Sequence, residues 1–186
     1  MIATDGVQTA RMAEDSAWLM SGLEDDVRPR MFEVADRDEA FALATIVKAD
    51  GGPRPVGAQM VVTARESWGF LSGGCIEDDV ALNAREVIDD GQPRAIVYGT
   101  GSPLIDIRLP CGGSIEVIIE RVSPTDAALA DLRSLTSARR PAVWISDGRL
   151  RNCIEQEHGD DTAPALIVRH YFPCQRLVVV GSDPFA

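Results

Sequence analysis

Apolar side chains recur at helical spacing in four parts of the chain. In the clearest of them Ile76, Val80 and Ala84 fall on one face, and Gly91 follows the last turn, as glycine does where many helices end. The pattern predicts helices over residues 9–22, 32–41, 75–88 and 125–139.

Between these helices, apolar runs without helical spacing predict strands. Residues 42–49 (ALATIVKA) form a continuous apolar run, which is typical of a strand buried on both faces. Residues 58–64 and 67–72 lie on either side of Arg65 and Glu66 and predict a hairpin. Together the two patterns predict an α/β (α+β) fold with a mixed β-sheet flanked by helices. The other predicted strands span residues 94–100, 105–110, 114–122, 142–148, 165–172 and 176–181.

The same pattern divides the chain into three parts. Residues 1–31 are expected to form a partly helical N-terminal extension, and residues 32–173 the main domain. Residues 174–186 are expected to begin a Rossmann-like segment, because RLVVVG (176–181) reads as a buried strand that arrives at a glycine. The helix and later glycines of a dinucleotide-binding unit do not follow, so we describe this segment as truncated and predict neither NAD nor FAD binding.

Composition narrows the function classes. The chain has 186 residues, of which 45% are hydrophobic and 25% charged, and its mean hydropathy of -0.02 is that of an ordinary globular protein. A net charge of -11 without a basic stripe disfavours nucleic acid and anionic membrane surfaces as partners. Lys48, the one lysine, lies outside any P-loop motif. The first residues lack a basic segment followed by an apolar core, so a cytoplasmic protein is expected.

Two segments combine a thiol with paired glycines, residues 72–75 (SGGC) and 110–113 (PCGG). Paired glycines allow positive φ angles and let a ligand approach the backbone. The first segment delivers Cys75 to a predicted helix N-terminus, which favours bound anions and a reactive or metal-binding thiolate. Acidic residues 77–79 share that first turn and would complement the helix dipole themselves, opposing an approaching anion. Alternatively, Cys75 and Cys111 are small buried residues beside tight turns.

Other polar residues give weaker signals. Arg54, held between two prolines in the 50–57 loop, would suit a phosphate or carboxylate, unless it is a solvated surface arginine. Cys153 and Cys174 lack the glycine context, and no C-x-x-C spacing occurs among the four cysteines, so free thiols rather than disulfides or a zinc site are expected. His158 and His170 do not indicate a hydrolase triad, because the chain offers no serine elbow to go with them. Residues 99–103 (GTGSP) do not match the G-x-S-x-G pattern of such an elbow.

Three segments in order, GGPRPVGAQM, SGGCIEDDVALNAREVIDDGQPRAIVYG and LPCGGSIEVIIERV, resemble the XdhC/CoxI family of molybdoenzyme maturation factors. The resemblance covers about residues 38–122, which makes residues 32–173 an XdhC/CoxI-like domain. It implies an accessory rather than an enzymatic role, in which the protein transiently binds the molybdenum cofactor. It also implies two kinds of partner, a cysteine desulfurase and the apoprotein of a xanthine or CO dehydrogenase-type molybdoenzyme.

The resemblance assigns roles to the candidate residues. Arg54, Gly73 and Gly74 would hold the phosphate or pterin of the cofactor. Cys75 is the first candidate to stand near molybdenum as a metal ligand, and Cys111 with Gly112 and Gly113 is the second, because thiolates suit soft, sulfur-rich centres.

Two other classes stay open. A sulfur transferase would use Cys75 as its nucleophile, and a non-catalytic interaction module would be half of a split two-domain protein that docks a basic partner. The sequence does not decide whether Cys75 and Cys111 meet within one chain or across a homodimer.

Overall fold

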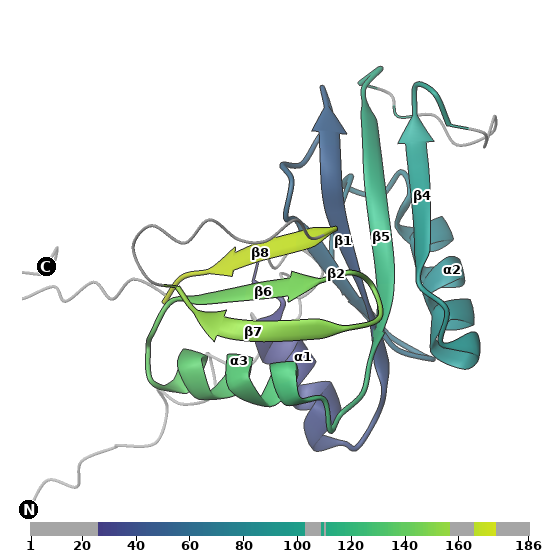
Figure 1. The fold of residues 1–186 in the computed structure, drawn as a ribbon. Helices are drawn as coiled ribbons and strands as arrows, with labels where there is room; N and C mark the ends of the chain where they lie inside the picture. The colour runs from purple at the N-terminus through teal and green to yellow at the C-terminus, as the bar shows by residue number, and fades with distance from the viewer. Residues whose placement is uncertain (1–25, 103–108, 110, 157–165, 174–186) are drawn as a thin grey trace, which may run out of the picture.

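The computed structural model describes residues 26–102, 109, 111–156 and 166–173 (Figure 1). The elements in chain order are α1 (Arg28–Asp36), β1 (Phe41–Asp50), β2 (Gln59–Val62), β3 (Ser67–Gly69), α2 (Glu77–Asp90), β4 (Arg94–Gly99), β5 (Ser114–Val122), α3 (Ala127–Ser137), β6 (Ala142–Ser146), β7 (Arg151–Glu155) and β8 (Ile167–Tyr171).

The strands form two sheets. Sheet A has the order β3-β2-β1-β5-β4, and sheet B has the order β7-β6-β8. The α/β class with flanking helices is confirmed. The sheets are not mixed in direction, however, since every strand pair within the described residues is antiparallel. Of the apolar run at 42–49, residues 42–46 are buried on both faces because different layers cover the two sides of sheet A, and no parallel pairing is needed, whereas Lys48 and Ala49 are exposed.

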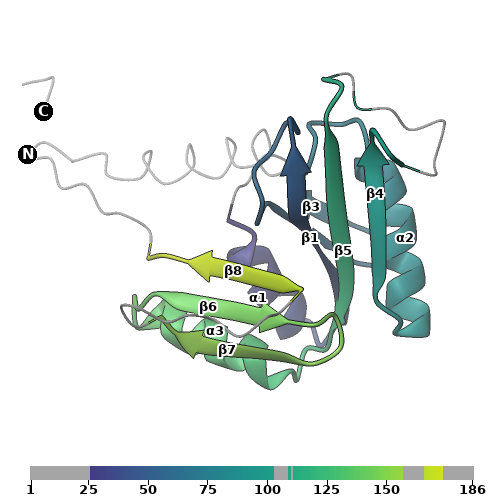
Figure 2. The same cartoon turned by 45° about the horizontal axis from the view of Figure 1, so that its top comes forward.

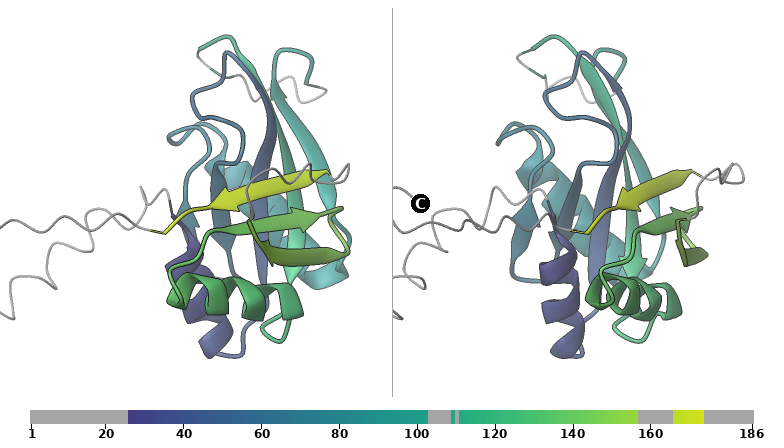
Figure 3. Two further views of the ribbon diagram at one scale, coloured as in Figure 1. Left: turned by 60° about the vertical axis from the view of Figure 1, so that its left-hand side comes forward. Right: turned by 90° about the vertical axis from the view of Figure 1, so that its left-hand side faces the viewer.

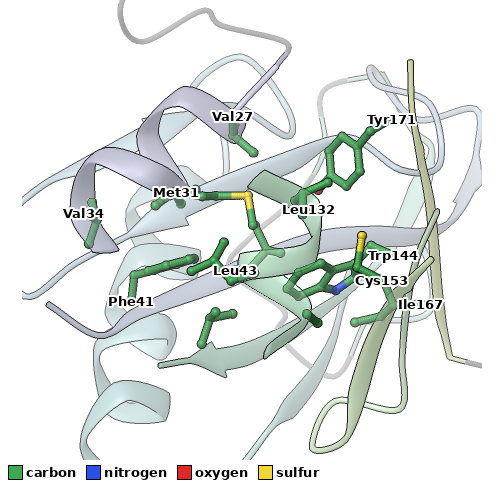
Figure 4. Packing of buried hydrophobic residues seen from close by; sticks show 14 of the residues in the cluster. Val27, Met31, Val34, Phe41, Leu43, Leu132, Trp144, Cys153, Ile167 and Tyr171 are labelled. Atoms are coloured by element: carbon green, nitrogen blue, oxygen red, sulfur yellow. The ribbon is translucent and has the colours of Figure 1, made fainter. Parts of the chain in front are cut away.

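Two hydrophobic cores lie on opposite faces of sheet A. Phe41 and Leu43 of β1 point into the first core, where sheet A meets α1, α3 and sheet B. Ala44 and Ile46 point into the second core, beneath α2. Figure 3 shows sheet B crossing one face of sheet A, and Figure 4 shows Met31, Trp144 and Tyr171 meeting between the layers. The alternation of β1 therefore fills both cores from one strand.

Buried polar side chains join the two sheets. Glu120 of β5 is completely buried and accepts hydrogen bonds from Trp144 Nε1 at 3.0 Å and Ser146 Oγ at 2.6 Å. Arg151 of β7 forms a salt bridge with the same carboxylate at 3.1 Å. Tyr171 of β8 donates to Gln59 Oε1 at 2.6 Å. These pairs satisfy polar groups that burial would otherwise leave without partners.

Two differences from the sequence prediction, at α1 and at β7, have local causes. Helix α1 begins at Arg28 with a proline in its first turn, and it ends before Asp38, whose φ is 56°. The predicted 32–41 helix was therefore placed too late, and the predicted boundary between residues 31 and 32 falls inside α1. Strand β7 was not predicted, because Cys153 is its one buried residue. The predicted helix at 9–22, the strand at 176–181 and all of the 105–110 strand except Leu109 lie outside the described residues.

Among the described residues, no helix is both long enough and apolar enough to span a membrane.

Candidate functional site

The topology of sheet A brings the last residues of two strands to the segment that precedes β5. Because β1 and β4 are antiparallel to β5, their last residues, Asp50 and Gly99, pair with Ser114 at the start of β5. Strand β3 runs in the same direction as β1 but ends at Gly69, level with Met60 of β2 and Ala44 of β1, so residues 70–76 leave the sheet well before the level of Asp50. Figure 2 shows the ends of β1 and β4 beside the start of β5. We call this end of sheet A the site edge.

One side-chain contact relates the start of α2 to the end of β4. Tyr98, which precedes Gly99, donates a hydrogen bond to Asp79 Oδ2 in the first turn of α2 at 2.6 Å. Ile76, next to Cys75, and Leu109, two residues before Cys111, are both buried in the second core. The segments that carry Cys75 and Cys111 therefore both lie toward this end of sheet A.

The 72–75 turn is organised around the carboxylate of Glu77, the first residue of α2. Backbone N–H groups of Ser72 and Gly74 donate to it at 2.6 and 2.8 Å, and that of Gly73 donates at 3.1 Å. The Ser72 hydroxyl adds a bond of 2.7 Å to Glu77 and accepts one of 2.9 Å from the Cys75 N–H. The turn therefore closes upon a side chain of its own helix.

These bonds keep Glu77 ionised. Partial burial alone would raise the pKa of its carboxyl, but hydrogen bonds from Ser72 and Leu71 outweigh burial and lower the pKa to about 2. The sequence predicted that acidic residues 77–79 would complement the helix N-terminus. Glu77 does so, and it also accepts hydrogen bonds from the backbone amides of Gly73 and Gly74, which were expected to bind an external anion. An incoming phosphate would have to displace this carboxylate to reach them.

The 111–113 turn is held by close backbone packing. A Cβ on Gly113 would lie 2.4 Å from the carbonyl oxygen of Gly51, and one on Gly99 would lie 2.1 Å from the oxygen of Gly113. The Thr100 N–H donates to that same Gly113 oxygen at 3.2 Å. Gly112 is different, since it is exposed with open space around it and a φ of 75°. Gly113 thus fixes the turn, while Gly112 and Cys111 face solvent.

Arg54 lies in the 51–58 loop between β1 and β2, half-buried rather than fully solvated. Its guanidinium stacks over the ring of Phe70, 4.2 Å from the ring centroid, and Phe70 leads into the 72–75 turn. The stacking places a cation beside the first turn. Sequence reasoning missed Phe70 and Tyr98 as parts of this region, and it recognised Glu77 only as a companion of the helix N-terminus.

The cysteines divide by exposure. Cys75 and Cys111 are exposed free thiols, so the alternative that both are small buried residues is wrong. Cys153 is a buried free thiol, and burial, with Asp131 nearby, raises its pKa to about 12, which fits its expected structural role. His170 is exposed, with Nδ1 3.2 Å from Gln156 Oε1.

In the part of the chain that the structure describes, no group of three or more His, Cys, Asp or Glu side chains is placed to hold a metal ion. The predictions for Cys174 and His158 lie outside the described residues.

Comparisons with known proteins agree with this architecture. The XdhC and CoxI family model matches residues 34–99, which include Arg54, Gly73, Gly74 and Cys75. The molybdenum cofactor insertion chaperone PaoD of Escherichia coli (strain K12) is 45% identical over 145 residues, covering 76% of this chain and 45% of PaoD. The chain thus spans less than half the length of that relative.

A solved structure shares the fold. A crystal structure described as a xanthine dehydrogenase from Bacillus halodurans matches 78% of this chain and 52% of its own, with a TM-score of 0.58 and 21% identity.

Proposed function

The chain carries an XdhC and CoxI family segment at residues 34–99, and from that premise we propose that it is a molybdenum cofactor chaperone. One observation carries the proposal: two thiols on glycine turns, far apart in the sequence, are both exposed, and the elements that follow them, α2 and β5, both contact the last residues of β4. The cofactor, which is the cargo here, combines a soft molybdenum–dithiolene centre with a flat pterin and a phosphate. Thiolates suit such a centre better than oxygen ligands do.

Each residue of the site edge has a role in this proposal. Cys75 approaches molybdenum, supported by a turn that Glu77 already holds in place. Cys111 approaches from the second turn, next to the exposed Gly112. Arg54, stacked on Phe70, supplies positive charge toward the anionic cargo. Gly73 and Gly112 keep the approach open, because a Cβ on either would meet no atom within 4 Å.

The finer parts of the proposal concern partners. We infer that the chain acts in the cytoplasm and hands the cofactor to an apoprotein of the xanthine or CO dehydrogenase type. A cysteine desulfurase supplies the terminal sulfur while the site edge holds the cofactor. The E. coli relative is described as an insertion chaperone, which supports delivery as the central role.

Anaerobic co-elution tests the proposal. The purified chain is mixed with molybdenum cofactor released from a donor enzyme, and the protein peak from gel filtration is assayed for molybdenum and pterin. We expect near-stoichiometric cofactor with the wild type, a large loss with Cys75→Ser, and a further loss in the Cys75→Ser, Cys111→Ser double variant.

Cys153→Ala is the matched control, since it removes a buried thiol far from the site edge and should leave cofactor binding unchanged. Circular dichroism checks that each variant is folded. A folded double variant that carries as much cofactor as the wild type would exclude the two cysteines as the site, and a folded wild type that carries none would overturn the chaperone proposal.

A further inference from the structure

A concave site that includes neither cysteine lies where β8 passes the end of the 51–58 loop. Its volume is about 450 Å³, and its walls include Asp26, Arg28, Gly57, Arg169 and Tyr171. Strand β8 is an edge strand of sheet B, and Figure 3 shows that it is the strand of sheet B nearest to the loop between β1 and β2. The site is therefore built from an edge strand of sheet B, the start of α1 and a loop of sheet A.

Arg169 is the unusual residue of this pocket. Its Nε is buried and has no hydrogen-bond partner among the described residues. The guanidinium lies over the ring of Tyr171, 5.4 Å from the ring centroid, which fixes its plane. A buried donor without an acceptor is unfavourable, so an acceptor that reaches it would stabilise the folded chain.

The neighbouring carboxylate is already engaged. Asp26 accepts hydrogen bonds from Arg28 through its backbone N–H at 3.1 Å, Nε at 2.8 Å and Nη2 at 2.6 Å. Arg28 also donates to the carbonyl oxygen of Phe172 at 2.9 Å. Burial would raise the pKa of Asp26, but Arg28 and, more weakly, the charge of Arg169 lower it. Two arginines thus share one carboxylate, and the lining keeps a net positive charge.

Gly57 packs closely against that charge. Its φ is +88°, and a Cβ at this position would lie 3.1 Å from Nη1 and 3.3 Å from Cδ of Arg169. Any larger residue would press upon the guanidinium, so only a glycine lets the loop approach Arg169 this closely. An orphaned buried donor and two arginines that line one concave site are together the features of an anion site.

We propose that this pocket binds the phosphate group of a small molecule, with Arg169 as its anchor. A guanidinium fork matches two phosphate oxygens at once, and the volume exceeds that of the anion alone. We take this phosphate to be that of the cofactor. The identity of the ligand therefore rests on the proposed function, which this assignment makes more specific. Free phosphate offers the same chemistry.

Inorganic phosphate tests the site without the cofactor. The midpoint of thermal unfolding is measured against phosphate concentration, with sodium chloride at equal ionic strength as the reference. Phosphate should stabilise the wild type in a saturable manner. Arg169→Met keeps much of the packing on Tyr171 and should weaken phosphate binding by about tenfold or more. Arg149→Met removes the same charge from an exposed turn and should have no effect. Equal phosphate affinity in both variants, or no saturable stabilisation of the wild type, would overturn the proposal.

The cofactor itself distinguishes the two sources of phosphate. If its phosphate occupies the pocket, removing that group with a phosphatase lowers co-elution with the wild type but not with Arg169→Met. Equal co-elution of both cofactor forms with the wild type would assign the pocket to free phosphate and overturn the cofactor assignment. Phosphate binding without any cofactor binding would overturn the proposed function and leave the phosphate site standing.

Discussion

In the 72–75 turn, backbone N–H groups converge on the Glu77 carboxylate, whereas in the 111–113 turn one backbone segment packs directly against two others. The two turns have the same residue types and both present an exposed cysteine. Glycines of the first turn have open space around them, while Gly113 has none. Similar motifs are thus stabilised by electrostatics in one case and by steric fit in the other, and substitutions can separate the two.

The largest effect is expected at the tightly packed glycine. Gly113→Ala places a Cβ 2.4 Å from the Gly51 carbonyl oxygen, and overpacking of backbone against backbone should lower the free energy of unfolding by about 3 kcal/mol. Urea denaturation measures it. Gly112→Ala is the matched control, since it meets no atom and should cost about 1 kcal/mol for its positive φ. Equal losses at the two glycines would contradict the steric account of this turn.

The next effect concerns the carboxylate of the first turn. Glu77→Gln keeps the shape of the side chain but replaces one acceptor oxygen with an NH₂ that faces N–H donors. We expect the free energy of unfolding to fall by about 2 kcal/mol at neutral pH. Asp78→Asn, an exposed neighbour in the same helical turn, should change it by less than about 0.5 kcal/mol. Similar values for the two variants would show that the helix dipole, and not the turn, is the partner of Glu77.

The difference in stability between the wild type and Glu77→Gln should depend on pH. Because folding lowers the pKa of Glu77 from 4.5 to about 2, its contribution is present above pH 4.5 and is lost as the pH falls toward 2. The difference in stability between the wild type and Glu77→Gln should therefore shrink over that window. Urea titrations at a series of pH values measure this difference. A difference that stays constant over the window would show that the charge of Glu77 does not contribute to stability.

The smallest effect is expected for the thiols. Cys75→Ser and Cys111→Ser alter exposed side chains, so each should change the free energy of unfolding by less than about 0.5 kcal/mol. Cofactor retention, measured on the same samples, should fall. A stability loss comparable to that of Gly113→Ala would make the cysteines structural parts of their turns.

Part of this architecture could be predicted from the sequence. The apolar run of β1 and the helical spacing of α2 were sufficient because tertiary packing agrees with the local pattern at both. Strand β7 was missed because most of its residues are polar and only partly buried. Glu120 could not be anticipated either, since a charged residue in a strand reads as solvent-facing until Arg151 and Trp144 supply its partners from another sheet.

For the candidate site, too, the sequence predicted the local motifs but not the contacts between distant residues. The cysteines and glycines were visible as a motif, but how each turn is held depends upon contacts across the sheet. The contact of Gly113 with Gly51 joins residues far apart in the chain, and no local spacing reports it. Glu77 was recognised as a companion of the helix N-terminus, yet its role as the anchor of the turn requires the fold of the loop.

The carboxylate at the centre of the first turn has a consequence for how cargo is exchanged. Since Glu77 satisfies the loop amides from within, the loop is preorganised before any cargo arrives, and loading carries little entropic penalty for ordering it. Under the proposed function, the same feature would let the empty and the loaded chain share one conformation, and release of the cofactor would require no rearrangement of the turn.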